Sequence, residues 1–183
     1  GEFCPILYKK SRFAALEGST FWLSENPELP GSISWGCRHS RICSWVRLAD
    51  RQTFQAFYVY NTHLDNESLE ARQKGIAMIM EQIRGRVGLD PVVLVGDFNA
   101  PSDEPTITTV RAADSPTPID ALASQSPDNQ DGTYHEFTGK PREPRIDYIF
   151  VSPEWQVAEG AILTEKGPIF SSDHFPIMTT LHL

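Results

Sequence analysis

The segment from residue 92 to residue 99 (VVLVGDFN) joins a short apolar run to two polar side chains, Asp97 and Asn99. On a β-strand, the side chains of residues i and i+2 point the same way, so the strand interpretation predicts that both groups are delivered together at its end. The carboxylate could accept a proton or bind a metal ion, and the carboxamide could donate a hydrogen bond to a phosphate oxygen. The alternative is that Asp97 and Asn99 only open a turn, where both residue types are common.

Asp173 and His174 stand next to each other, just before the apolar segment 175–181. Adjacent residues can face different partners, so the carboxylate could contact a cation while the imidazole contacts a nucleophilic water. The alternative is that Asp173 is a turn residue and that His174 is a solvated neighbour.

Asp147 lies inside the apolar segment 146–150. A carboxylate buried in such a strand costs several kcal/mol unless it is paired. A histidine that must keep one tautomer for acid/base chemistry is a suitable partner. The alternative is a surface ion pair between Asp147 and Arg145 on an edge strand.

His63 lies near the end of a fourth segment (YNTHLD, residues 60–65) and would share a strand face with Asn61. It could donate a hydrogen bond to a phosphate oxygen or to the leaving oxygen. The alternative is a core histidine whose ring is satisfied by backbone groups.

Together the four segments provide what metal-assisted phosphoester hydrolysis needs: hard oxygen ligands for Mg²⁺ or Mn²⁺, a base for water, and hydrogen-bond donors for the charge that develops on the phosphate. We therefore expect six side chains to line one cleft, with Asp147 within hydrogen-bonding distance of His174. These side chains are His63, Asp97, Asn99, Asp147, Asp173 and His174.

The elements that must position these residues are mainly strands. Short segments rich in β-branched and aromatic residues predict strands over residues 5–8, 19–24, 42–48, 54–62, 91–98, 146–152 and 177–182. Residues 68–84 predict a helix, with Leu69, Ile76, Ile79, Met80 and Ile83 on the apolar stripe and Arg72 facing away. A second helix is expected after Asp103, and residues 112–132 are interpreted as a loop. Strands with inserted helices favour two packed sheets flanked by helices.

The composition fits one globular domain over residues 1–183, with enough apolar residues for a core. The net charge of −8 argues against a protein that grips nucleic acid through a basic surface. No apolar run approaches the roughly 20 residues needed to span a bilayer, and three cysteines without a CxxC pair favour neither a zinc cluster nor a complete disulfide framework. We expect a monomer, and no signal peptide is visible, so localisation stays open.

Read in order, the segments NTHLD, GDFNA, RIDYIF and SDHFP resemble the motifs of the endonuclease/exonuclease/phosphatase superfamily, whose fold is DNase I-like. The resemblance implies a four-layer α/β/β/α sandwich and a metal-dependent phosphoric ester hydrolase, a nuclease or a phosphatase. It implies that Asp97 is the acid/base group near the metal, that Asn99 holds the scissile phosphate and that Asp173 contacts the metal. It also implies that His174 acts at the phosphate, that Asp147 orients it and that His63 stabilises charge there.

The resemblance implies ligands Asp97, Asn99 and Asp173 for Mg²⁺ or Mn²⁺, and substrate contacts from His63, Asn99 and His174. Arg41 is expected near the site without a catalytic role. The resemblance implies a phosphoester substrate, of nucleic acid, phospholipid or sugar phosphate, without deciding among them, and the loops 112–132 and 139–145 are expected to set specificity.

The family pattern also has an upstream strand-helix-strand segment that ends in a metal-binding Glu, and Glu2, Glu25 and Glu28 lack that context. The expectation is therefore an N-terminally incomplete domain, in which the segment 54–62 or a neighbour presents an uncovered edge and Mg²⁺ binding is weakened. The alternative functions are a catalytically impaired fragment and a non-catalytic binding domain on the same scaffold.

Overall fold

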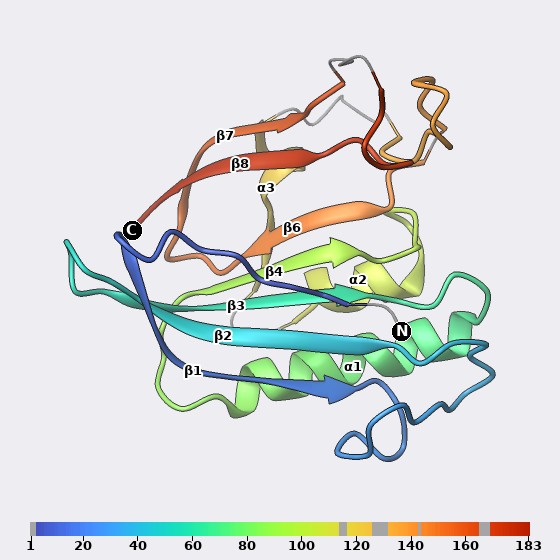
Figure 1. Ribbon diagram of the computed structural model, residues 1–183, viewed down its shortest axis with the longest axis horizontal. Helices are drawn as coiled ribbons and strands as arrows, with labels where there is room; N and C mark the ends of the chain where they lie inside the picture. The colour runs from blue at the N-terminus through green and yellow to red at the C-terminus, as the bar shows by residue number, and fades with distance from the viewer. Residues whose placement is uncertain (1–2, 114–116, 126–131, 143, 165–168) are drawn as a thin grey trace.

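The computed structural model describes residues 3–113, 117–125, 132–142, 144–164 and 169–183 (Figure 1). Its strands are β1 (Phe13–Trp22), β2 (Ile42–Asp50), β3 (Ala56–His63), β4 (Val92–Asp97), β5 (Ile119–Asp120), β6 (Asp147–Val151), β7 (Gln156–Ile162) and β8 (Ile177–His182). Its helices are α1 (Leu69–Gly85), α2 (Pro105–Arg111) and α3 (Ala121–Gln125). None of the described helices is long and apolar enough to cross a membrane.

Six strands form one mixed sheet in the order β1-β2-β3-β4-β6-β5. Only β3 and β4 run parallel, because α1 carries the chain back between them, and the other neighbouring pairs are antiparallel (Figure 1). The ends of β3 and β4 therefore meet the start of β6 at one edge of the sheet. This edge carries the polar residues that follow each strand.

The helix predicted over residues 68–84 forms α1 and begins where the Ser68 hydroxyl accepts a hydrogen bond from the Ala71 N–H at 3.2 Å. Two residues of α1 differ in burial from the prediction. Leu69 is 43% exposed, whereas Arg72, expected to face solvent, is 9% exposed. The reason is tertiary: the Arg72 guanidinium makes two 2.9 Å bonds to the Glu104 carboxylate at the start of α2.

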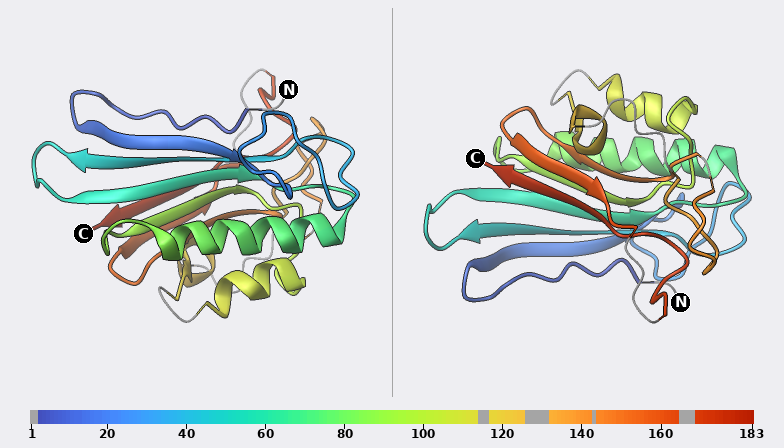
Figure 2. Two further views of the ribbon diagram at one scale, coloured as in Figure 1. Left: turned by 90° about the horizontal axis from the view of Figure 1, so that it is seen from below. Right: turned by 90° about the horizontal axis from the view of Figure 1, so that it is seen from above.

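Two apolar clusters hold the layers together. Helices α1 and α2 pack on one face of the six-stranded sheet through residues such as Ile76, Ile107 and Phe150, and Figure 2 shows both helices on that side. The other face contacts the two-stranded sheet of β7 and β8 around Val93 and Trp155. The predicted α/β class is confirmed, and three layers of the expected four-layer sandwich lie within the described residues.

Several strand expectations need correction. Residues 5–8 form no strand, although Asn61 Nδ2 donates to the Pro5 carbonyl at 2.9 Å and so fixes the segment. The strand predicted over residues 19–24 begins earlier, at Phe13. The sequence pattern did not identify β7, because a register shift between Val157 and Glu159 interrupts its alternation.

The stretch 112–132, interpreted as a loop, contains β5 and α3. Residues 114–116 and 126–131 of that loop, and residue 143 of the loop 139–145, lie outside the described residues, as does Glu2. The segment 54–62 has no uncovered edge, because β3 pairs with β2 on one side and with β4 on the other. Its neighbour β2 is paired on both sides as well, so β1 stands at that end of the described sheet.

Candidate active site

Three of the predicted side chains lie in one row across the six-stranded sheet. His63 at the end of β3 pairs in register with Asp97 at the end of β4, and Asp97 pairs with Asp147 at the start of β6. Neighbouring strands lie about 5 Å apart, so the register alone brings these groups together. Gly96 makes the close approach possible, because a Cβ at this position, with φ +145°, would lie 1.9 Å from the Thr62 carbonyl oxygen.

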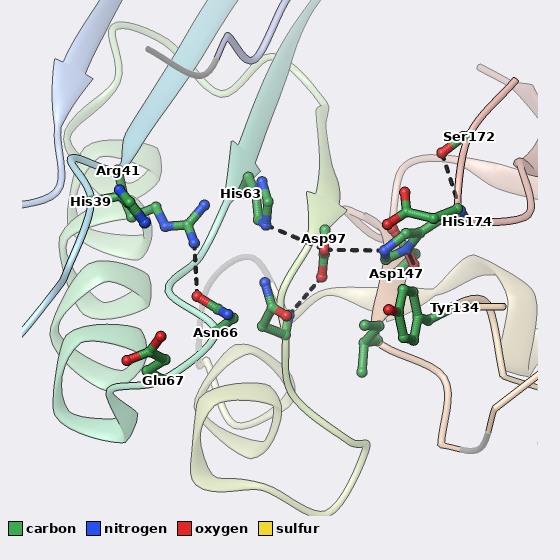
Figure 3. Close-up of a pocket in the computed structure, with 13 residues that line it drawn as sticks. His39, Arg41, His63, Asn66, Glu67, Asp97, Tyr134, Asp147, Ser172 and His174 are labelled. Atoms are coloured by element: carbon green, nitrogen blue, oxygen red, sulfur yellow. Dashed lines mark hydrogen bonds and ion pairs between the residues drawn. The ribbon is translucent and has the colours of Figure 1, made fainter. Parts of the chain in front are cut away.

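Asp97 lies between two imidazoles (Figure 3). Its Oδ2 is 3.3 Å from His63 Nε2 and 3.8 Å from His174 Nε2. Burial and the neighbouring charge of Asp147 raise the pKa of Asp97 to about 7. A carboxyl group with this pKa can accept or release a proton near neutral pH, and a nearby cation would favour its ionised form.

His174 is held by Asp147, as the sequence predicted. His174 Nδ1 lies 2.8 Å from Asp147 Oδ2, and since an ionised carboxylate only accepts hydrogen bonds, Nδ1 carries the proton. This hydrogen bond raises the pKa of His174 and so favours the imidazolium. The alternative surface pair of Asp147 with Arg145 is wrong: Arg145 pairs with Asp120 at 2.6 Å, and β6 lies between β4 and β5.

Asn99 reaches the site by a route that the strand pattern did not predict. Strand β4 ends at Asp97, and Asn99 has φ +48°, the left-handed conformation that Asn tolerates better than most residues. The Asn99 N–H donates to Asp97 Oδ1 at 2.8 Å, and Asn99 Nδ2 donates to the Leu64 carbonyl at 3.0 Å. The turn interpretation is therefore correct for the backbone, while the side chain still lines the cavity.

His63 is not a buried core histidine, because its side chain is 35% exposed. Asn61 was expected to share a strand face with His63, but it does not line the cavity and so is not part of the site.

All six predicted side chains line one cavity of about 750 Å³ (Figure 3). The cavity is also lined by seven residues that sequence reasoning did not assign to it as functional: His39, Arg41, Asn66, Glu67, Tyr134, Ile146 and Ser172. Ile146 and Ser172 lie inside the motifs RIDYIF and SDHFP, and Asn66 and Glu67 directly follow NTHLD, so these four could have been found from the motifs. His39 and Tyr134 carry no such signal, because only tertiary folding brings them to this edge.

Arg41 lies at the site, as the resemblance implied. It lines the cavity, with its guanidinium 3.5 Å from Asp65 Oδ2 and 3.1 Å from Asn66 Oδ1. Both Arg41 and Asp65 are buried. Asp65 thus holds from behind the guanidinium that lines the side of the cavity away from His174 (Figure 3).

Oxygen and nitrogen donors gather closely enough to hold a metal ion. One ligand atom each from Asp97, Asp147 and His174 lies within 4.8 Å of the others. Two adjacent carboxylates, one of them with a raised pKa, suit a hard divalent cation that would neutralise them. Of the predicted ligands only Asp97 is in this group; Asn99 and Asp173 line the same cavity, and their role toward a metal stays a prediction.

The model of the endonuclease/exonuclease/phosphatase family matches residues 6–174. The chain belongs to this family. The resemblance carried by the four motifs is thereby confirmed, and membership places the protein among hydrolases of phosphoester bonds. No match was found among curated proteins.

Solved structures agree with the family assignment. An endonuclease/exonuclease/phosphatase from Bacteroides vulgatus is 32% identical with a TM-score of 0.88, over 96% of this chain and 68% of that one. The mannosyl-6-phosphatase of Bacteroides thetaiotaomicron is 29% identical with a TM-score of 0.85, over 96% and 69%. Humanized D. rerio TDP2, at 20% identity and a TM-score of 0.71 over 95% and 69%, shares the fold.

Proposed function

We propose that this protein is a divalent-metal-dependent phosphoesterase that hydrolyses a phosphodiester or phosphomonoester bond, with Mg²⁺ or Mn²⁺ as its cofactor. The observation that carries the proposal is the placement of Asp97 between His63 and His174, with His174 fixed by Asp147. A base, two imidazole donors and an orienting carboxylate thus surround one point of the cavity.

The residues divide the chemistry between them. Asp97, which lies between the two imidazoles, accepts the proton of the attacking water. His174 presents Nε2 to a phosphate oxygen, while the bond from Nδ1 to Asp147 fixes the ring and favours its protonated form. His63 donates to charge on the phosphate or the leaving oxygen, and Asn99 contacts the phosphate.

Asp97, with Asn99 and Asp173 nearby, would hold the cation, which when bound would supply positive charge that polarises the phosphoester. The chain's own contribution is to keep its carboxylates close together at the sheet edge. The −8 net charge and a cavity of about 750 Å³ favour a small or single-stranded substrate over duplex DNA.

The activity named for the Bacteroides thetaiotaomicron relative supports a phosphorylated small molecule as one candidate substrate. Single-stranded nucleic acid and phospholipid headgroups remain the other classes with the required phosphoester. The protein is proposed to act as a monomer, since all six side chains come from one chain.

The test is hydrolysis of three substrates: mannose 6-phosphate, a single-stranded oligonucleotide and phosphatidylinositol 4,5-bisphosphate. Each is assayed with Mg²⁺, with Mn²⁺ and with excess EDTA. We expect turnover of at least one substrate that EDTA abolishes and added Mg²⁺ restores. Absence of cation-dependent hydrolysis on all three would favour the alternative of a non-catalytic binding domain.

A further inference from the structure

A second, apolar cavity adjoins the first at His174. It has a volume of about 430 Å³ and shares two wall residues, Ser172 and His174, with the candidate active site. Its other walls include Leu163, Ile169 and Phe170. If a substrate phosphate lies at His174, the group on its ester oxygen can therefore extend directly into this second cavity.

The walls expose apolar side chains although they stand beside a polar site. Ile169 is 80% exposed and Leu163 is 41% exposed. Apolar side chains that flank a functional site in this way mark a place where a ligand removes them from water. The continuity with the active site indicates which ligand: the part of the substrate that is attached to the phosphate.

The aromatic wall is rigidly supported from behind. Phe170 packs on the His135 ring at 4.5 Å between centroids, and His135 packs on Phe175 at 4.1 Å. His135 and Phe175 are buried, so neither ring is free to turn away. Gly139 also lies against Phe170, since a Cβ at that position would lie 2.5 Å from Phe170 Cζ. A wall already ordered before binding loses little conformational entropy when a ligand contacts it.

The polar groups of this cavity are few. Besides His174, the cavity has the Ser171 and Ser172 hydroxyls and the buried His135 ring. A substituent with hydroxyls on every side would leave several of them unpaired against Leu163, Ile169 and Phe170, which is unfavourable. A flat apolar ring matches the aromatic and aliphatic walls instead.

We propose that this cavity is the subsite for an apolar ring on the ester oxygen, so that the preferred substrates are aryl phosphoesters. This rests on the proposed phosphoesterase function and extends it to a substrate class. The ring lies against Phe170, Ile169 and Leu163 while its phosphate lies in the adjoining cavity and contacts His174.

The test compares two phosphonates that cannot be hydrolysed. The Mg²⁺-loaded protein is titrated by calorimetry with phenylphosphonate and with methylphosphonate. We expect phenylphosphonate to bind about tenfold more tightly or better, because its ring is removed from water. The Ile169→Ser variant should lose most of that advantage and still bind methylphosphonate like the wild type.

Leu89→Ser is the matched control. Leu89 is 88% exposed and precedes β4, whereas the site follows it, so this variant should retain the full preference for phenylphosphonate. A third arm compares kcat/KM for phenyl phosphate with that for mannose 6-phosphate, and we expect the phenyl ester to be preferred.

The outcomes separate the two proposals. Equal affinities for the two phosphonates, or a preference for mannose 6-phosphate, would overturn the ring subsite and leave the phosphoesterase in place. If neither phosphonate bound and no ester were hydrolysed, both proposals would be wrong. An unchanged ring preference in Ile169→Ser would assign the ring to another surface.

Discussion

The proposed site concentrates negative charge on a few atoms at one sheet edge. Asp97 and Asp147 face each other across the β4 and β6 pairing, and this proximity, added to burial, raises the pKa of Asp97. His174 offsets part of the repulsion, because it lies close to both carboxylates. Asp147 therefore has a double effect: it holds the imidazole in place and makes Asp97 a better base.

Replacing Asp147 by Asn should lower turnover by about 10²-fold or more, because it removes the acceptor that fixes the His174 ring and its proton. The Asp90→Asn variant is the control: Asp90 lies before β4, at the other end of that strand, and pairs with Arg47 at 2.6 Å. The measurement is kcat with saturating Mg²⁺. Equal turnover in the Asp147→Asn variant and the control would remove Asp147 from the mechanism.

For single residues, the sequence predicted which side chains pair with each other better than it predicted which way a side chain points. A carboxylate in the apolar segment 146–150 needs a partner, and this requirement led correctly to the pairing of Asp147 with His174. The direction of Asn99 was not predictable from strand alternation, because its positive φ takes the chain out of the strand. Tyr134 was missed for another reason: it meets His174, with 5.1 Å between the ring centroids, only after the chain has folded.

The elements around the site are tied together by an ion pair whose two side chains are only 10% and 14% exposed. Arg72 of α1 bonds both carboxylate oxygens of Glu104 at the start of α2, and its Nη1 donates to the Asp65 carbonyl at 3.0 Å. Asp65 follows β3 and lies two residues after His63. Arg72 thus links α1 and α2 to the loop between β3 and α1, which begins directly after His63.

Arg72→Met should lower the free energy of unfolding by about 3 kcal/mol, since it leaves the Glu104 carboxylate without its charged partner. Lys74→Met is a suitable control on the same helix. Lys74 forms an exposed i,i+4 pair with Glu70, and losing it should change stability by less than about 1 kcal/mol. Urea unfolding measures both variants, and a loss under about 1 kcal/mol in Arg72→Met would contradict the assigned role.

The same ion pair predicts a pH dependence of stability. Burial would raise the pKa of Glu104, but the hydrogen bonds from Arg72 and Thr106 outweigh it, so the pKa lies below the usual value of 4.5. A lowered folded-state pKa means that this stabilisation is complete above about pH 4.5 and is lost as the pH falls through the folded-state value. Urea unfolding between pH 6 and pH 3 should therefore show a weaker pH dependence in Glu104→Gln than in the wild type. Identical slopes would show that Glu104 does not contribute.

The helix α1 was predictable because its apolar stripe faces one core, and β4 was predictable because its short uninterrupted apolar run packs into both clusters. The segment 5–8 looked like a strand because of its apolar residues, yet strand formation needs a hydrogen-bonded neighbour, and these residues contact the sheet through Asn61 instead. Strand β5, with two residues, is too short for any alternation to be seen. Strand β7 has no fully buried residue and is interrupted by a bulge, so its apolar pattern is weak.

On the scale of the whole molecule, the two packed sheets and the helices α1 and α2 hold in place the end of the six-stranded sheet where β3 and β4 end and β6 begins. The family motifs predicted the α/β class, and the fold explains why four motifs spread over more than a hundred residues are needed: each occupies a different strand end or adjoining loop. The adjoining apolar cavity had no sequence signal, because Leu163, Phe170 and His135 come from separate segments. The polar centre was thus predictable from the sequence, and its apolar surroundings were not.

The most direct test of the account is the turnover of Asp97→Asn and His174→Ala on the best phosphoester substrate with saturating Mg²⁺. Both side chains have a proton-transfer or charge-stabilising role in the proposed mechanism and neither belongs to the apolar core. We therefore expect each variant to lose about 10²-fold or more in kcat, with circular dichroism and thermal unfolding like those of the wild type. Near-wild-type turnover in both variants would contradict the account and place the chemistry elsewhere in the molecule.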